Sequence, residues 1–496
     1  MQLVAYGAQD VYLTGNPQIT FWKVTYRRHT NFAMESIEQT FNGQADFGRR
    51  VQCTVSRNGD LAYRTYLQVT LPEINQDDNA AGSVYARWLD CPGEQLISMV
   101  EVEIGGQRID RQYGDFMHIW NQLTLCSEQE DGYNKMIGNT TQLTFLTDPT
   151  FADVATACGA AAVPEAVCAP RNALPETTLY VPLQFWFCRN PGLALPLIAL
   201  QYHEVKINIE IRPMDECLFA VTQVGVSAAP GKNVKATAAY SKSLVAASLY
   251  VDYIFLDTDE RRRMAQNPHE YLIEQLQFTG DESIGSSSNK IKLNFNHPCK
   301  EIIWVVQPDD NVSYCDSFVE TKVLNMALGA QPFNYTDAID ALPNSIRAFS
   351  SSKQLNDGGA AGNTSVINTN GLFSDPNAGH DATTGNLVAG AVSELSGNLG
   401  SAGVTNGVSD AGAFVLAETS LKMHCWGENP VVTAKLQLNG QDRFSEREGT
   451  YFDLVQPFQH HTRTPDTGIN VYSFALRPEE HQPSGTCNFS RIDNAT

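Results

Sequence analysis

Few residues of this chain are spaced as a reaction centre requires. The segment GDESIGSSS from Gly280 is similar to a phosphate loop, but Ser286 stands where such a loop needs the lysine that reaches the phosphates. His460 and His461 are adjacent, and neighbours in an extended segment point to opposite faces, so we expect surface or inter-subunit polar contacts rather than a shared ion. No GxSxG, HExxH or CxxC motif occurs. The sequence therefore predicts no catalytic residue, no cofactor site and no metal site.

The stretch FWKVTYRRH near the start combines cations with aromatic side chains. Large apolar residues at positions 22, 24 and 26 alternate with polar or basic ones, which predicts a strand that buries its aromatic side and presents its cations on the other. Such an arm suits either phosphate or a protein with an acidic surface. The chain has 34 Lys and Arg against 55 Asp and Glu, a formal net charge of -21, so its surface as a whole repels nucleic acid. The candidate contact residues are Trp22, Lys23, Tyr26, Arg27 and Arg28.

Length and composition limit the elements that could position these residues. Single cores stop growing beyond about 250 to 300 residues, so 496 residues predict two large domains. Only 18% of the residues are charged, and the abundance of Gly, Asn, Thr and Pro favours strands and turns. The eleven cysteines, an odd number, suit reduced thiols, although Cys158 and Cys168 could bridge. We expect an all-β protein without a signal peptide or membrane span.

Hydrophobic periodicity supports the all-β expectation in both halves. Apolar residues alternate with polar ones over 100–104, 205–211, 291–295 and 435–438, and a further strand should begin within 271–280. Two helices are expected. One follows Asp115 as its cap, with apolar residues at 116, 119, 120 and 123. The other, at DTDERRRMAQ, is capped by Asp257, Thr258 or Asp259, pairs its arginines locally, and links the halves.

Two short phrases recur along the chain. IEQTFNG at 37–43 is similar to IEQLQFTG at 273–280, and EIGGQRID at 103–110 is similar to QLNGQDRF at 437–444. The distance along the chain between the two phrases is longer in the second half, and an insertion at 356–413 explains the difference. That insertion is rich in small and polar residues, so we expect an exposed or partly disordered loop. The repeats indicate a duplicated β domain.

The opening phrase GAQDVYLTGNPQITFWKVTYRRHTNFA closely resembles the N-terminus of the major capsid proteins of large icosahedral double-stranded DNA viruses of algae and protists, the chlorella-virus and mimivirus-like groups. Further similar phrases follow in order: SRNGDL, EIGGQRIDRQYGD, LYVPLQFWFCRNPGLALPLIALQYHEVKI, VDYIFLDTDERRRMAQNPHEYLIEQLQ, LQLNGQDRFSEREGTYFDLVQPFQHHT and PSGTCNFSRIDNA. Departures are confined to loops near 150–175, 220–243 and 337–417.

The resemblance implies an all-β fold of two tandem eight-stranded jelly rolls (a double jelly roll) with few short helices and long surface loops. It divides the chain into an arm at 1–28 on the inner capsid face, a first jelly roll at 29–257, a helical linker at 258–270, and a second jelly roll at 271–496 with a long exposed loop at about 337–417. It carries no catalytic residues.

The same resemblance implies how the protein assembles. Three chains form a homotrimer of pseudo-hexagonal outline, the capsomer, and capsomers tile an icosahedral shell. The expected partners are neighbouring capsomers and, on the inner side, minor capsid and penton proteins. An internal membrane lies nearby without insertion, and no direct contact with nucleic acid is expected. The location is the virion capsid, after synthesis and assembly in the host cytoplasm.

A second hypothesis remains open, since jelly rolls also serve as lectins. It is a glycan-binding or glycan-hydrolysing double β-sandwich, and hydrolysis requires two carboxyl groups about 5 to 10 Å apart in a groove. Asn363, in an N-x-S/T triplet, is a possible glycosylation site. An enzyme acting on nucleotides is excluded by the missing phosphate-loop lysine.

Overall fold

The computed structural model describes residue 4 and residues 7–75, 84–144, 147–149, 168–170, 173–222, 235–315, 329–337 and 428–496. The insertion at 356–413, the candidate glycosylation site Asn363 and Cys158 lie outside the described residues.

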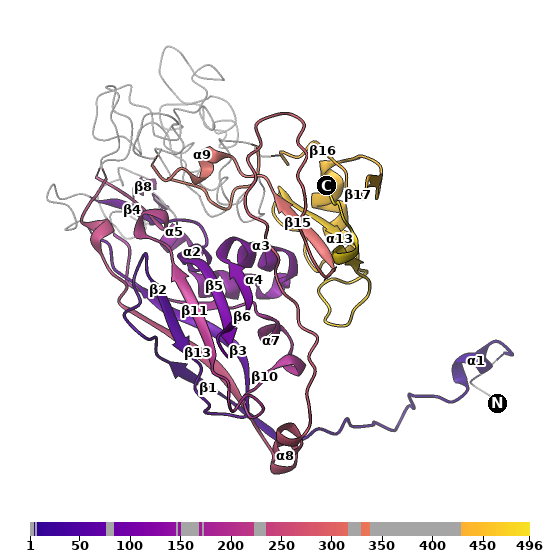
Figure 1. The fold of residues 1–496 in the computed structure, drawn as a ribbon. Helices are drawn as coiled ribbons and strands as arrows, with labels where there is room; N and C mark the ends of the chain where they lie inside the picture. The colour runs from indigo at the N-terminus through magenta and orange to yellow at the C-terminus, as the bar shows by residue number, and fades with distance from the viewer. Residues whose placement is uncertain are drawn as a thin grey trace.

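Two facing sheets form the first half of the chain (Figure 1). Eight main strands build them: β1 Phe32–Gln39, β2 Arg50–Thr54, β3 Leu61–Leu71, β5 Ile97–Ile104, β6 Gln107–Tyr113, β9 Thr177–Pro182, β11 Val205–Ile211 and β13 Ala246–Leu256. One sheet has the order β1-β13-β3-β9 and the other β2-β11-β5-β6. Counted along the chain, these are strands 1-8-3-6 and 2-7-4-5, the strand order of a jelly roll. The expected eight-stranded jelly roll is therefore present in this half.

Shorter elements complete the first half. β10 Leu195–Pro196 also pairs with β3, β4 Tyr85–Trp88 pairs with β12 Leu218–Val221, and β7 Thr147–Pro149 pairs with β8 Cys168–Pro170. The short helices of this half are α1 Asp10–Thr14, α2 Pro92–Leu96, α4 Glu130–Ile137, α5 Thr141–Thr144, α7 Trp186–Arg189, η2 Ser127–Gln129, η3 Pro191–Leu193, η4 Met214–Glu216 and η5 Ala239–Ser241.

The core of this half lies between its two sheets. Val100 and Val102 of β5 and Ile207 and Ile209 of β11 are fully buried. Glu101, between the two valines, is also buried and pairs with three arginines, Arg50, Arg108 and Arg111. The buried aliphatic residues confirm the two strands predicted from alternation. Each such aliphatic side chain contributes about 1.5 to 3 kcal/mol by its removal from water. The sheet interior therefore supplies most of the stability of this half.

Helix α3, Gly114–Thr124, confirms the helix expected from the apolar spacing, but its predicted cap is wrong. The N-cap position is Tyr113, and Asp115 lies inside the first turn without a capping hydrogen bond. Packing explains the start at Gly114, because a Cβ atom there would lie 2.1 Å from the carbonyl oxygen of Ile97. Only glycine allows the helix to begin so close to β5.

Helix α8, Thr258–Gln266, confirms the helix predicted at DTDERRRMAQ and lies between the two halves. The Asp257 carboxylate accepts a hydrogen bond from the Thr258 amide at 2.7 Å, which is the predicted cap. Arg263 pairs with Glu260 at 3.5 Å, as expected, whereas Arg261 reaches Asp60 of the first half at 3.0 Å. The linker is therefore tied to the end of the first sandwich.

The described residues of the second half form short two-stranded ladders. They are β14 Pro298–Cys299 with β21 Cys487–Asn488, β15 Glu301–Val305 with β20 Ile469–Ser473, β16 Thr433–Ala434 with β19 Arg447–Glu448, and β17 Gln437–Leu438 with β18 Gln441–Asp442. The helical elements are α9 Asp309–Val312, η8 Tyr451–Val455, α13 Gln456–His460 and η9 Phe489–Arg491.

The strands predicted at 271–280 and 291–295 do not form ladders. Residues 271–278 instead lie along β6, where the Gln275 side chain donates to the Ile109 carbonyl at 2.5 Å and the Leu276 amide donates to the Asp110 carboxylate at 3.3 Å. In the other segment, the Leu293 amide donates to the Ala495 carbonyl at 2.9 Å. Hydrogen bonds to side chains and single backbone hydrogen bonds, rather than a continuous ladder, hold these segments. Period-two alternation cannot distinguish these two arrangements.

One of the two sequence repeats has the same local structure in both copies. β5 and β6 are joined by Gly105 and Gly106 with φ of 61° and 81°, and β17 and β18 by Asn439 and Gly440 with φ of 52° and 78°. Positive φ at both central residues defines a type I′ hairpin, which favours Asn-Gly and Gly-Gly. The similarity between 103–110 and 437–444 is therefore structural.

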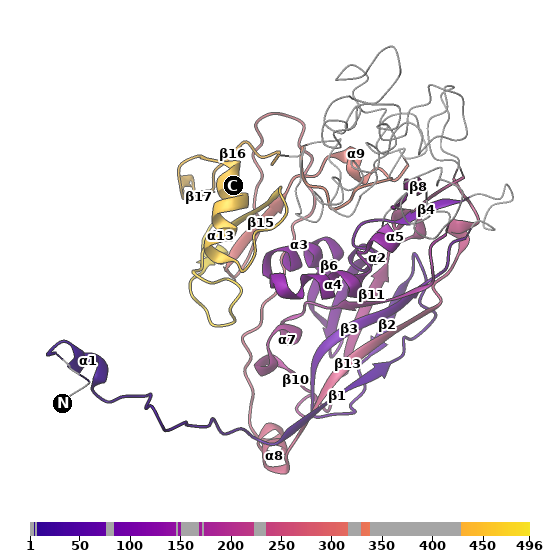
Figure 2. The ribbon, with the colours of Figure 1, turned by 180° about the vertical axis from the view of Figure 1, so that it is seen from behind.

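The halves also share a buried apolar cluster. Ile119 and Leu123 of α3 pack with Tyr335, Ile469 and Val471 of the second half. Figures 1 and 2 show α3 and α4 between the sandwich of the first half and the β15 region. The two halves therefore pack directly against each other through α3. None of the described helices has the length and apolarity to cross a membrane.

Candidate assembly surfaces and buried polar centres

The N-terminal arm, residues 7–31, projects from the body instead of packing on it. Figures 1 and 2 show it leaving beside α8 and running away from both halves. Phe21 is 100% exposed, Trp22 88% and Tyr26 84%. The prediction that this segment is a strand burying its aromatic side is wrong for the single chain, because no strand among the described residues pairs with it and the first described ladder begins at Phe32. The three large rings are therefore left exposed by the described part of the chain.

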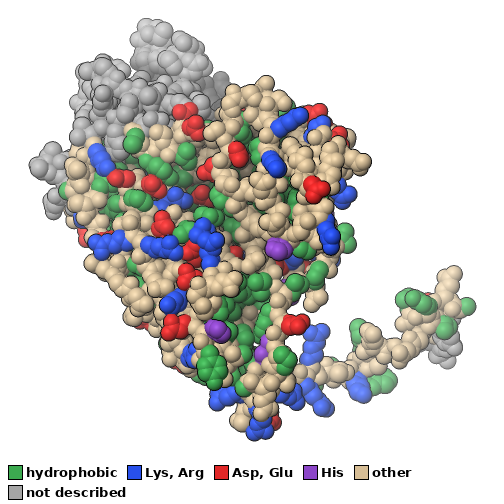
Figure 3. Space-filling model, in the orientation of Figure 1, with side chains coloured by type: hydrophobic (Ala, Val, Ile, Leu, Met, Phe, Trp, Pro, Cys, Tyr) green, Lys and Arg blue, Asp and Glu red, His purple; other side chains and the backbone are tan. Residues whose placement is uncertain are grey.

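The cations of the arm are also available for a partner. Lys23, Arg27 and Arg28 are exposed, and no ion pair joins them to any other residue in the described part of the chain. Figure 3 shows Lys and Arg side chains gathered where the arm meets the body. A run of exposed rings with free cations, on a protein of net charge -21, is suited to a partner surface that is both apolar and acidic.

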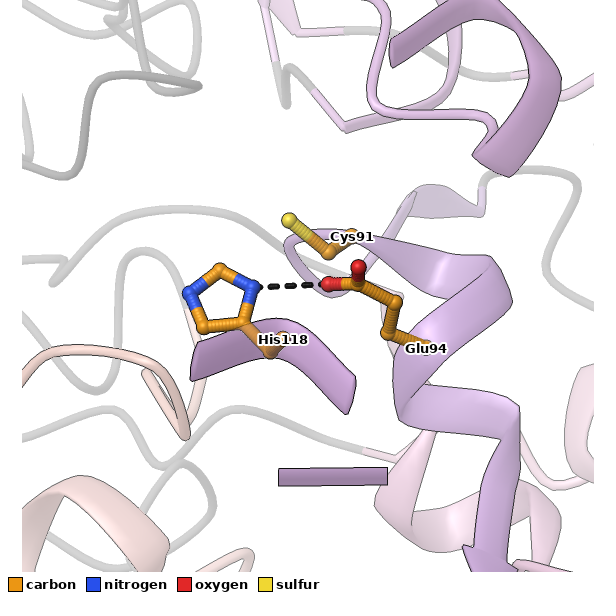
Figure 4. A group of neighbouring side chains, drawn as sticks. All are labelled: Cys91, Glu94 and His118. Atoms are coloured by element: carbon orange, nitrogen blue, oxygen red, sulfur yellow. Dashed lines mark hydrogen bonds and ion pairs between the residues drawn. The ribbon is translucent and has the colours of Figure 1, made fainter. Parts of the chain in front are cut away.

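A buried polar centre that the sequence did not predict lies at the junction of the halves (Figure 4). It consists of Cys91 before α2, Glu94 within α2 and His118 within α3, all buried. His118 Nδ1 lies 2.7 Å from Glu94 Oε2, and the imidazole stacks on Phe333 of the second half with ring centres 4.1 Å apart. The three residues are spread over two helices without a motif spacing, so no sequence signal marks them.

The carboxylate of Glu94 is the acceptor on which this centre depends. Its Oε1 accepts hydrogen bonds from the Asn121 amide at 3.1 Å and from the Tyr133 hydroxyl at 2.5 Å. Burial opposes charge on His118, but the nearby Glu94 carboxylate outweighs this and raises the pKa of the imidazole. Glu94 therefore holds α2, α3 and α4 together through three side chains.

Cys91, Glu94 and His118 offer three possible ligand atoms within 4.8 Å of one another. Hydrogen bonds within the protein occupy these groups. Burial, followed by the Glu94 charge, raises the pKa of the Cys91 thiol well above its usual value, so this thiol is protonated. Both Glu94 oxygens already accept hydrogen bonds from protein donors. The arrangement fits a hydrogen-bonded core network.

Asp110 is the buried carboxyl group that could suggest hydrolytic chemistry. Burial raises its pKa to about 6, against hydrogen bonds from the Leu276 amide and the Gln112 side chain that lower it. Its oxygens accept from Arg111 N at 2.9 Å, Gln112 Nε2 at 3.2 Å and Leu276 N at 3.3 Å. This carboxyl group therefore anchors the segment that crosses β6.

The prediction of surface or inter-subunit contacts is wrong for His461. His460 is the last residue of α13, and His461 is buried, where its Nε2 lies 2.8 Å from Glu301 Oε2 and its Nδ1 lies 2.8 Å from Glu479 Oε1. His461 follows the helix in extended backbone, and these two contacts lie within the chain. Glu301 and Glu479 are 160 and 18 residues away, so only the fold brings them together.

We expect His461 to make the stability of the protein depend on alkaline pH. Burial alone would lower its pKa, but hydrogen bonds that the ring donates to the Glu301 and Glu479 carboxylates raise it to about 9. Because the folded pKa exceeds the unfolded value of about 6.5, the stabilisation is complete below about pH 6.5 and is lost as the pH rises through about 9. It amounts to about 3 kcal/mol at most.

Chemical unfolding of the protein and of His461→Gln from pH 6 to 10 checks this expectation. The free energy of unfolding of the unmodified protein should fall toward that of the variant above pH 9. Because every other titrating group is shared, parallel profiles for the two proteins would contradict it.

Comparisons with known proteins place these features in context. A model of the major capsid protein N-terminus matches residues 20–257, and a model of the large eukaryotic DNA virus major capsid protein matches residues 260–496. The chain is 75% identical to the major capsid protein of Phaeocystis pouchetii virus, over 100% of this chain and 91% of that protein. It is 38% identical to the major capsid protein of Paramecium bursaria Chlorella virus 1, over 100% and 85%.

Solved structures show the same likeness. The quasi-atomic model of the PBCV-1 virus capsid matches with a TM-score of 0.58 and 34% identity, over 96% of this chain and 86% of that one. The Faustovirus major capsid protein matches with a TM-score of 0.58 over 99% and 90%, and at 13% identity it shows the fold alone. Together these matches confirm the expected all-β fold of two tandem jelly rolls.

Proposed function

This chain belongs to the major capsid proteins of large eukaryotic DNA viruses and is a structural protein of the virion capsid, and we propose that it acts as a homotrimeric capsomer of pseudo-hexagonal outline. Its relatives carry the name of a structural protein rather than an enzyme, and the glycan-binding alternative is not favoured. The observation that carries the proposal is the pairing of two β halves through a shared core within one chain.

The proposed division of the chain follows from the same pairing. We divide it into the arm at 1–28, jelly rolls at 29–257 and 271–496, and the linker at 258–270. Helix α8 lies between the halves, and the type I′ hairpin recurs in both. Three copies of a chain with two similar halves place six similar units around one axis. Closed three-fold symmetry then pairs every interface between subunits within the trimer.

Measuring the mass of the purified protein in solution tests the trimer. Multi-angle light scattering should give three times the chain mass of 54.5 kDa. The measured mass should not change when the protein is diluted, because obligate interfaces of about 2,000 to 5,000 Å² stay associated. Electron microscopy of the same sample should show particles with a six-cornered outline. A monomer, or a dimer, would contradict the proposal.

The partners of the arm are part of the proposal. We propose that Trp22, Lys23, Tyr26, Arg27 and Arg28 contact protein on the inner capsid face, where minor capsid proteins, penton proteins and neighbouring capsomers meet. Full exposure of the arm rings and their unpaired cations supports this. The internal membrane then lies nearby without insertion, and nucleic acid is not contacted directly.

The site of synthesis completes the proposal. We place synthesis and assembly in the host cytoplasm, where thiols remain reduced. The eight cysteines whose side chains the structure describes are free thiols, which supports that compartment.

A further inference from the structure

Two cysteines of the second half face each other across a β ladder. β14 pairs antiparallel with β21, and Cys299 is the direct partner of Cys487. Directly opposite residues of an antiparallel pair have Cα atoms about 4.5 to 5.5 Å apart and side chains on one face. A disulfide needs Cα atoms about 4.4 to 6.8 Å apart. We propose that Cys299 and Cys487, free thiols in this structure, form a cross-strand disulfide when the protein meets an oxidising low-molecular-weight disulfide.

The surroundings of the two thiols differ in a way that orders the reaction. The Cys299 thiol donates to the carbonyl oxygen of Glu301 at 3.0 Å, and burial raises its pKa to about 12. Burial also raises the pKa of Cys487, but Arg443 opposes this, and Cys487 is the less enclosed of the two. Cys487 therefore ionises first and is the attacking thiolate.

The reaction then proceeds by two exchanges. The Cys487 thiolate attacks one sulfur of the small disulfide, whose S–S bond breaks and releases one small thiolate. The thiolate of Cys299, once deprotonated, attacks the Cys487 sulfur of this mixed disulfide and releases the second small thiolate. The two protein thiols lose two electrons and two protons in total, and the small disulfide is reduced to two small thiols.

The bond would add a covalent link to the hydrogen bonds that hold the C-terminal segment. The Phe489 amide donates to the His297 carbonyl at 3.1 Å, the His297 amide donates to Ser490 Oγ at 2.7 Å, and the Leu293 amide donates to the Ala495 carbonyl at 2.9 Å. The ladder itself has only two residue pairs. A covalent link here closes a loop that includes most of the second half, and long loops give the largest loss of unfolded-state entropy. This role is independent of the proposed capsid function.

Peptide mapping of the full chain tests the proposal. The protein is purified under reducing conditions with the exposed Cys126 and Cys315 replaced by Ser, incubated with oxidised glutathione, treated with N-ethylmaleimide, and digested without reductant. The expected product is one cross-linked peptide pair that contains Cys299 and Cys487 and lacks the mass of two hydrogen atoms. The remaining cysteines should be found as maleimide adducts or unreacted buried thiols.

Two variants control the order of events. Cys299→Ser should stop at a glutathione adduct on Cys487, and Cys487→Ser should leave Cys299 as a thiol. The proposal is overturned if both cysteines of the parent protein remain thiols, if Cys487 keeps its glutathione, or if either one pairs with a different cysteine. The mapping uses the folded parent protein, so a folding defect in a variant does not affect the main result.

Discussion

Deletion of residues 1–28 should leave trimers intact and prevent shell assembly. Residue 4 and residues 7–28 make no ladder with the described body, and the first described strand begins at Phe32, so the described core of the jelly roll keeps its contacts. The shell loses the exposed rings of Trp22 and Tyr26 and the cations around them. Buried aromatic anchors at interfaces contribute about 2 kcal/mol or more each, so losing even one weakens a contact about 30-fold. Light scattering for trimers and electron microscopy for shells provide the two measurements.

Point variants separate the rings of the arm from its charge. Trp22→Ala with Tyr26→Ala should impair assembly at every salt concentration, whereas Arg27→Gln with Arg28→Gln should impair it most at low salt, where exposed charges are least screened. If the chain without residues 1–28 formed shells in normal yield, the arm would not be needed for assembly. The proposed role of its exposed rings would then be contradicted.

Replacement of Glu94 by Ala should cost about 3 to 5 kcal/mol of folding free energy, because it leaves buried polar partners without their shared acceptor. Those partners are His118, Asn121 and Tyr133, and they come from α3 and α4. The same helix α3 supplies Ile119 and Leu123 to the core shared by the halves. The loss should therefore appear in the unfolding of both halves.

Glu94→Gln is the matched control, since it keeps an acceptor oxygen for Asn121 and Tyr133 and replaces the carboxylate oxygen beside His118 by an uncharged amide NH2 group. We expect it to lose less than half as much stability as the alanine variant in chemical unfolding at pH 7 and fixed protein concentration. Equal losses for the two variants would show that the charge, and not the shared acceptor, stabilises the junction. A loss below about 1 kcal/mol for Glu94→Ala would contradict the role of the network.

The fold was predictable from the sequence where a local pattern of residues is compatible with only one backbone structure. Alternation at 100–104 and 205–211 requires one wet and one buried face, and both segments lie in strands. The Gly105-Gly106 and Asn439-Gly440 pairs require positive φ, and both are hairpin turns. Alternation at 291–295 has a second solution, an extended segment held by side chains and single backbone bonds, and the chain adopts it.

The candidate sites were less predictable because their partners come from distant residues. The arm was identified by its composition, but its exposure depends on the absence of a neighbouring strand among the described residues, which composition does not encode. Glu94 and His118 lie on different helices, and His461 meets Glu301 across 160 positions. These pairings follow from the sheet order and the packing of the helices, not from spacing along the chain.

The pairing of β1 with β13 has a mechanical consequence. Phe32, the first strand residue after the arm, is the direct partner of Leu256, which lies next to the linker. Tension between an arm bound to a partner and the second half would therefore act on one end of this eight-pair ladder and separate its residue pairs one after another. Strain in a swelling or maturing shell would be released at the margin of a single sheet, while the β3 and β11 interior stayed closed.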